Sequence, residues 1–194
     1  MRNIWFVSDT HFGHKNILNH ANRPFITVDE MNHVLVNNWN NCVSKNDIVW
    51  HLGDFSFQNK IQFDDLLSNL NGEIHVVLGN HDKTISQNKR FFLESGKLRS
   101  VQNYAELKID NNFFVLNHYG QRVWNRHHYG SIHLYGHSHG SLPPVGLSVD
   151  VGVDCKEITE EYRPISLDEV LSYMKNKTSH VADYHGSSLD KTIH

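Results

Sequence analysis

The chain has 194 residues, with 18 basic and 21 acidic side chains and a formal net charge of −3. This slightly acidic balance argues against a protein that coats DNA or a membrane surface, since such proteins are normally basic. Apolar residues make up 39% and charged residues 20%, which is typical of a folded globular domain. The chain also holds 16 histidines, and because histidine is the commonest metal ligand, their positions are the guide to function.

Cysteine content and apolar runs exclude two further classes of protein. Cys42 and Cys155 are the two cysteines, and their spacing fits neither a zinc finger nor a redox motif. A disulfide scaffold and a thiolate metal site are therefore excluded, and a reducing compartment is favoured. The first apolar run, residues 4–7, is too short for a signal peptide, and no run approaches the roughly 20 residues of a membrane span. We expect a cytoplasmic protein that does not enter a membrane.

Short apolar runs that end in polar clusters predict the strands. Five of these runs are residues 4–7, 48–52, 74–78, 113–116 and 132–135, and each is followed by Asp, Asn or His. Continuous β-branched and aromatic runs of this length, bounded by turn residues, are typical of buried strands. Residues 104–110 are expected to form a hairpin with the fourth run through Asn111-Asn112, and residues 147–153 one further strand.

Four segments have the periodicity or boundary residues of helices. A capping box at Thr27 and Glu30 precedes the first, and a second box at Ser166 and Glu169 opens a helix that ends near Lys175. The other two are expected over residues 62–70 and 86–95. Strands alternating with helices predict an α/β fold with a mixed sheet, in which ligands bind at the carboxyl ends of the strands.

The sequence predicts a single domain over residues 1–175. Residues 176–194 are polar and lack periodicity, so they are expected to form a flexible C-terminal tail.

Oxygen and imidazole ligands lie at the predicted strand ends, in five separate loops. They are Asp9, His11, Asp54, Asn80, His118, His137 and His139. Two carboxylates, one amide and four imidazoles are too many ligands for one metal ion. They suit two ions about 3.5–4 Å apart that share a bridging carboxylate.

These residues also follow the order of a known family. Between residues 9 and 139, the ordered elements are Asp9-Thr10-His11, Gly53-Asp54, Gly79-Asn80-His81-Asp82, His118 and Gly136-His137-Ser138-His139. This set resembles the motifs of the calcineurin-like metallophosphoesterases. The resemblance implies a four-layer α/β/β/α sandwich with mixed sheets and a binuclear metal site at the sheet edge.

The resemblance also implies a role for each residue. The first metal ion is expected to bind Asp9, His11, Asp54 and His139, and the second Asp54, Asn80, His118 and His137. His81 is expected to protonate the leaving oxygen or to steady the phosphoryl charge, with Asp82 orienting its ring.

Two departures from the family pattern accompany the match. Phe55-Ser56-Phe57 follows Asp54, where another acid is often found nearby. Tyr119 follows His118, where glycine is common. We choose His118 as the ligand because it directly ends a predicted strand, and His127 and His128 are the alternatives.

Further residues are candidates for binding the substrate. His14 could reach a phosphate or cap a helix, and Arg23 could clamp a phosphate or lie on the surface. Residues 119–129 interleave aromatic and cationic side chains, including Arg122 and Arg126, which suits either nucleotide stacking or a packed lid.

The resulting prediction is a metal-dependent phosphoesterase. A hydroxide that bridges two divalent ions is expected to attack a phosphate ester, with manganese favoured and iron, zinc, nickel or cobalt as alternatives. A phosphodiesterase or small-substrate phosphatase is favoured, and its substrate is a small phosphorylated molecule, nucleotides included. The alternatives are a non-catalytic metal-binding scaffold of the same fold and a nuclease acting on nucleic acid. The oligomeric state stays open.

Other histidines are predicted to be structural. His51, His75 and His133 are expected to be packed and hydrogen-bonded within strands. His20 and His33 are expected on helices, and His180, His185 and His194 in the tail.

Overall fold

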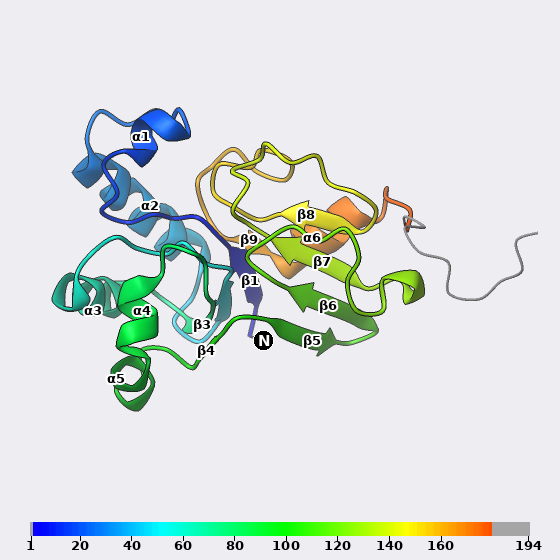
Figure 1. Cartoon of the computed structure of the whole chain (residues 1–194), viewed down its shortest axis with the longest axis horizontal. Coiled ribbons are helices and arrows are strands. Elements are labelled where there is room, and N and C mark those ends of the chain that lie inside the picture. Colours follow the sequence, from blue (N-terminus) through cyan, green and yellow to red (C-terminus); the bar gives the residue numbers. More distant parts are fainter. Residues whose placement is uncertain (1, 180–194) are drawn as a thin grey trace, which may run out of the picture.

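The computed structural model describes residues 2–179, which form two β-sheets with a shared apolar core (Figure 1). The first sheet has the order β4-β3-β2-β1-β9, with β1 (Ile4–Val7), β2 (Ile48–His51), β3 (Glu73–Val77), β4 (Ser100–Gln102) and β9 (Ile165–Ser166). The second has the order β5-β6-β7-β8, with β5 (Ala105–Ile109), β6 (Asn112–Leu116), β7 (Ile132–Tyr135) and β8 (Ser148–Asp150). Each sheet is parallel except at one edge, where β9 or β5 runs antiparallel.

The helices are α1 (Ile17–His20), α2 (Val28–Cys42), α3 (Lys60–Asn69), α4 (Lys83–Gln87), α5 (Lys89–Glu94) and α6 (Leu167–Met174), with a 3₁₀ turn η1 (His127–Tyr129). Helices α1 to α5 cover the first sheet on the side away from the second, whereas α6 packs against the core between the sheets (Figure 1). One core forms where Met31 and Trp39 of α2 and Phe63 of α3 pack against Val49 and Val76 of the sheet. Burial of these apolar faces holds the helices in place, since helices this short are marginal alone.

A second apolar core lies between the sheets. Phe6 of β1 stacks on Phe114 of β6 with ring centroids 5.8 Å apart. Val170 and Met174 of α6 complete this core. The outer face of the second sheet is covered by residues 119–131, whose Trp124 packs against His133 of β7. The mixed α/β fold with two mixed sheets is thus confirmed.

The predicted elements match the structure with three corrections. The hairpin turn falls at Asp110-Asn111, one residue earlier than expected, because Asp110 adopts a left-handed backbone with φ 51°. The single helix expected over residues 86–95 is wrong. Instead α4 and α5 meet at Asn88, whose side chain donates to the Thr84 carbonyl and ends α4. Strands β4 and β9 have only three and two residues, too few to stand out as sequence patterns.

Helix boundaries follow the predicted caps. Ser166 and Glu169 form a complete capping box at α6, whereas at α2 Thr27 accepts from the Glu30 backbone and Glu30 accepts from the Ile26 backbone. None of the helices within residues 2–179 is both long and apolar enough to cross a membrane. Residues 180–194, with most of the predicted tail and its three histidines, lie outside the described residues.

The strand histidines are packed and hydrogen-bonded, as predicted. His51 pairs with the Thr10 hydroxyl, and His75 pairs with the Ser100 hydroxyl. In His133, Nδ1 lies 3.0 Å from the Val115 carbonyl, and Nε2 accepts from the Gln121 backbone N–H at 3.0 Å. A neutral ring that carries its proton on Nδ1 satisfies both contacts of His133.

This arrangement predicts a specific acid sensitivity. Burial lowers the pKa of His133 to about 4, whereas a histidine in the unfolded chain has a pKa of about 6.5. The unfolded chain therefore takes up a proton that the folded chain refuses, so the stability contribution is complete above about pH 6.5 and is lost towards pH 4. The loss is at most about 3 kcal/mol.

Urea unfolding between pH 4.5 and 7.5 measures this effect. We expect the free energy of unfolding to depend less on pH in His133→Asn than in the exposed control His33→Asn. Equal pH slopes in the two variants would show that His133 does not cause the sensitivity.

Candidate metal centre

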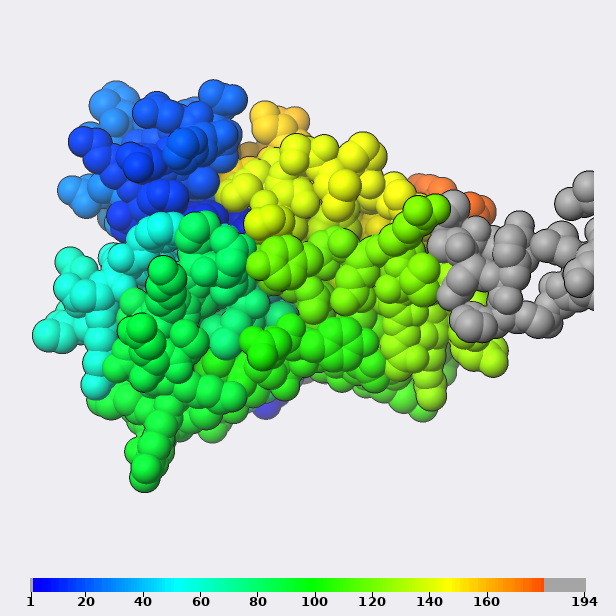
Figure 2. Space-filling model, in the orientation of Figure 1, coloured from blue at the N-terminus to red at the C-terminus, as the bar shows by residue number. Residues whose placement is uncertain are grey.

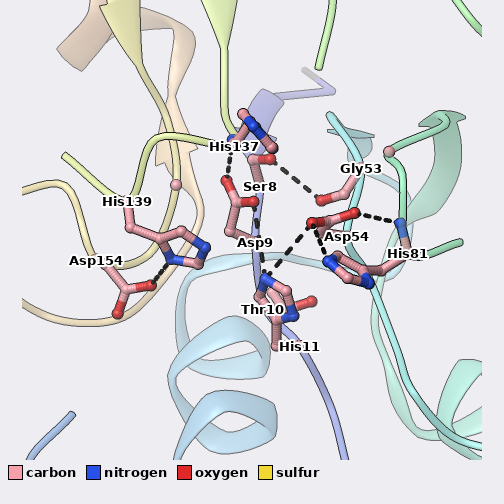
Figure 3. Close-up of polar contacts among 12 residues, drawn as sticks. Ser8, Asp9, Thr10, His11, Gly53, Asp54, His81, His137, His139 and Asp154 are labelled. Atoms are coloured by element: carbon pink, nitrogen blue, oxygen red, sulfur yellow. Dashed lines mark hydrogen bonds and ion pairs between the residues drawn. The ribbon is translucent and has the colours of Figure 1, made fainter. Parts of the chain in front are cut away.

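The predicted ligands converge where the strands of the two sheets end. Figure 3 shows those that are labelled there, namely Asp9, His11, Asp54, His137 and His139. Asp9 and His11 follow β1, Asp54 follows β2 and Asn80 follows β3, while His118 follows β6 and both His137 and His139 follow β7. Two sets of possible ligand atoms form, each within 4.8 Å: Asp9, His11 and His139, and Asp54, His118 and His137. The structure thus brings together side chains that are up to 130 residues apart.

Asp54 lies between the two sets. Its Oδ2 is 3.7 Å from His11 Nε2 and 3.5 Å from His118 Nε2. Asn80 Oδ1 approaches His118 Nε2 at 3.1 Å, so the amide also faces the second set. The Asp54 carboxylate therefore lies within 4 Å of an imidazole nitrogen from each set.

The backbone of these residues is unusual. Among residues 2–179, nine non-glycine residues have a positive φ, and five of them are predicted ligands: Asp9, His11, Asp54, His137 and His139. Such conformations cost free energy in non-glycine residues and cluster at functional sites. The fold therefore holds these side chains in an arrangement that local backbone preference does not explain.

Two glycines allow the loops to approach each other closely. A Cβ at Gly79 would lie 2.3 Å from Asp54 Oδ1, and one at Gly136 would lie 2.0 Å from Ser8 Oγ. Neither position has room for a side chain, which explains why glycine precedes Asn80 and His137.

Two histidines are oriented by fixed partners. His118 Nδ1 lies 2.8 Å from the Leu52 carbonyl, which requires a proton on Nδ1 and leaves Nε2 free to bind a metal. His139 Nδ1 lies 2.6 Å from Asp154 Oδ2, so its Nε2 is directed in the same way by a carboxylate (Figure 3). A backbone carbonyl therefore orients one histidine of the second set, and a carboxylate orients one histidine of the first set.

Arg23 is buried, so the prediction that it lies on the surface is wrong. Its guanidinium makes a bidentate ion pair with Asp154, with both N–O distances 2.8 Å. It also donates to the carbonyls of Asp9 and Thr10, at 2.6 and 2.9 Å. The guanidinium of Arg23 therefore joins the β1 loop to Asp154.

Asp82 also has a different role from the predicted one. Its carboxylate accepts the backbone N–H groups of Asp54, Phe55 and Gly79 at 2.8–2.9 Å. No contact joins it to the His81 ring among the described residues. Asp82 therefore joins the loops that follow β2 and β3 and does not orient His81.

His81 and His14 lie at the rim of the centre. The His81 side chain is 45% exposed, its Nε2 lies 4.0 Å from Asp54 Oδ2, and its backbone N–H donates to Asp54 Oδ1. His14 stacks on Phe57 with ring centroids 3.7 Å apart and lies 3.4 Å from His11, Nδ1 to Nδ1. It does not cap α1, whose N-cap residue is Asn16.

The remaining arginine candidates lie beside residues other than the proposed ligands. Arg122 is exposed and lines a separate cavity with Tyr135 and Leu142. Arg126 covers the Phe113 ring at 4.8 Å, near the start of β6, whereas the ligands lie beyond the end of that strand. His127 and His128 are in η1, so the structure favours His118, the chosen ligand, over these alternatives.

Burial shifts the pKa values of the Asp9 carboxylate and the His11 imidazole in opposite directions. Burial raises the pKa of Asp9 to about 7 and lowers the pKa of His11 to about 3. Burial would also raise the pKa of Asp54, but His118 and the His81 backbone N–H outweigh it and lower this pKa to about 2. Asp54 is therefore charged at neutral pH, and a cation beside Asp9 would favour its charged form as well.

Sequence reasoning missed Asp154 and Asp150. Asp154 holds His139 and Arg23, and Asp150 accepts the backbone N–H groups of Gly140 and Gly152. Both lie at or just after the end of β8, so the rule that identified the other residues, acidic groups at strand ends, could have found them.

Comparisons with known proteins agree with this geometry. Residues 2–145 match the family model described as the calcineurin-like phosphoesterase superfamily domain. An uncharacterized protein of Methanocaldococcus jannaschii is 36% identical over 179 residues, which cover 90% of this chain and 93% of that protein. The Gene 66 protein of Mycobacterium phage L5 is 38% identical over 85 residues, 42% of this chain and 41% of that protein.

A solved structure shows the same fold. A protein of unknown function from Aquifex aeolicus aligns over 89% of this chain and 99% of its own, with a TM-score of 0.67 and 22% identity. Since the family model and the archaeal relative both span most of the sequence, the chain belongs to the calcineurin-like phosphoesterase superfamily.

Proposed function

We propose that this protein is a metal-dependent phosphoesterase that hydrolyses a phosphate ester at a centre of two divalent ions. The observation that carries the proposal is the position of Asp54 Oδ2, 3.7 Å from His11 Nε2 and 3.5 Å from His118 Nε2. In this proposal the first ion binds Asp9, His11, Asp54 and His139, and the second binds Asp54, Asn80, His118 and His137.

Unpartnered buried atoms support metal binding. Asp9 Oδ1 and His11 Nε2 are buried and have no hydrogen-bond partner. A buried polar atom without a partner costs about 1–3 kcal/mol, and a cation between these two atoms removes that cost. Oxygen and imidazole donors without thiolate suit manganese, which we favour, and also iron, zinc, nickel or cobalt.

The chemistry divides between the metal ions and the protein. Two divalent ions lower the pKa of water and offset the negative charge on phosphoryl oxygens. In this proposal the protein holds the ester beside Asp54, and loops with a left-handed backbone at five of the ligands hold the ligand side chains in place. His81, open to solvent at the rim, is positioned to give a proton to the leaving oxygen as a general acid.

Two cavities favour a diester as the substrate. One, of about 470 Å³, lies beside Asn80, and the other, of about 530 Å³, lies beside His137 and His139. Figure 2 shows the second region, where the yellow segment around residues 137–145 borders the blue N-terminal segment. A phosphate bound between these cavities has room for an ester group on each side.

Metal-dependent turnover tests the proposed function. After removal of metals with a chelator, we expect addition of Mn²⁺ to restore hydrolysis, faster with bis(p-nitrophenyl) phosphate than with p-nitrophenyl phosphate. Asp54→Asn should lower kcat/KM by at least roughly 100-fold, because both ions lose their shared ligand. Asp65→Asn, which changes an exposed carboxylate on α3, should keep the wild-type kcat/KM.

Two outcomes would favour the alternatives. A protein that binds metal but shows no turnover with manganese, nickel, cobalt, iron or zinc is a scaffold. Cleavage of single-stranded DNA or RNA, with binding that weakens steeply as salt rises, would favour a nuclease.

The role of His81 has a distinct signature. His81→Ala should lower kcat by roughly 10²–10⁴-fold for esters with poor leaving groups and much less for p-nitrophenyl esters, which leave without a proton. Metal affinity should stay unchanged because His81 is not among the proposed ligands. The control His33→Ala, an exposed histidine on α2, should alter neither quantity. A loss that does not depend on the leaving group would contradict general acid catalysis.

Asp154 should control how tightly the first ion binds. Removing the charge in Asp154→Asn weakens the orientation of His139, and partners of this kind typically contribute about 10–100-fold in metal affinity. The matched control is Asp150→Asn, a buried carboxylate of the same strand end that accepts only backbone N–H groups. Cobalt titration followed by visible absorption measures the affinity of each folded variant. Equal affinities for the two variants would refute this role.

A further inference from the structure

The cavity beside Asn80 has the chemistry of a nucleoside site. We infer that it binds the nucleoside of a nucleotide ester, with the Tyr119 ring as its stacking surface, an inference that rests on the proposed function. The polar and aromatic side chains that line this cavity include those of Asn80, Lys83, Ser86, Asn103, Asn117 and Tyr119. Its volume of about 470 Å³ is within the range of small-molecule sites, roughly 300–1,000 Å³.

Tyr119 connects the cavity to the metal centre. Its ring packs edge-on against His118 and His137, with centroid distances of 5.0 and 4.8 Å. Its hydroxyl lies 3.4 Å from Asn80 Oδ1, and its backbone N–H donates to Asn117 Oδ1 at 2.8 Å. These contacts fix the orientation of the side chain, which is nevertheless 47% exposed. An exposed, oriented aromatic ring is the surface on which a base stacks.

The polar lining suits the edge of a base. Asn103 and Asn117 carry amides, each with a donor and an acceptor, which is the pairing that base edges present. Asn117 is held in place because its Nδ2 donates to the Asn103 carbonyl at 3.3 Å. Lys83, exposed at the start of α4, adds a positive charge that attracts a phosphate.

The position of the cavity joins base recognition to the reaction. Asn80 both lines the cavity and faces the second set of metal ligands, through His118 Nε2 at 3.1 Å. A phosphate held at the centre and a base held on Tyr119 can therefore belong to one nucleotide.

Calorimetry of the metal-loaded full chain tests this inference with three probes. Adenosine 5′-monophosphate should bind at least about tenfold more tightly than ribose 5-phosphate or inorganic phosphate, because only the first has a base to stack. Tyr119→Ala should remove that difference, whereas Tyr119→Phe, which keeps the ring, should retain it. The matched control is Tyr129→Ala, which changes a tyrosine that is 80% exposed and lies in η1.

Equal binding of adenosine 5′-monophosphate and ribose 5-phosphate would overturn the inference, as would identical behaviour of Tyr119→Ala and Tyr129→Ala. Turnover of bis(p-nitrophenyl) phosphate is measured separately. Turnover without a preference for the base refutes this inference alone, and a preference without turnover refutes the proposed function alone. Competition by a single-stranded deoxyadenosine hexamer indicates that the nucleoside belongs to a strand, and lack of competition indicates a small nucleotide ester.

Discussion

The site depends on the Asp54 carboxylate, which lies at the junction of the two sheets. It lies within 4 Å of imidazole nitrogens from three other loops, those of His11, His118 and His81. Burying a negative charge is costly unless cations or hydrogen-bond donors surround it. The loops at the neighbouring strand ends supply those groups. The packing of the two sheets therefore determines which groups surround the charge of Asp54.

Keeping these loops together requires buried polar braces. Arg23 joins the β1 loop to Asp154, and the Asp82 carboxylate accepts hydrogen bonds from backbone N–H groups of the loops after β2 and β3. Buried ions of this kind are tolerated only when they are paired and hydrogen-bonded. The two apolar cores and these braces together offset the cost of the left-handed backbone at five of the proposed ligands.

The same architecture suggests how one family fold acquires a particular substrate. The proposed metal ligands come from strand ends, which the two packed sheets hold rigidly. The cavities beside them are lined by loop and helix residues such as Lys83, Asn103 and Tyr119, which can change without disturbing the sheets. In the proposed function, the metal ligands would set the reaction type, and the other residues that line the cavities would set the substrate.

The sequence by itself determined most of the strands and the positions of the seven proposed ligands. Those signals are local: an apolar run followed at once by Asp, Asn or His. Only the tertiary structure decided the roles of Arg23, Asp82 and Asp154, because each role depends on a partner brought in by folding. Arg23 and Asp154 are 131 residues apart, and their ion pair depends on the bridge between Ser8, which follows β1, and Gly152, which follows β8. Local sequence patterns predict which positions along the chain carry ligand residues, whereas tertiary packing determines which groups each side chain contacts.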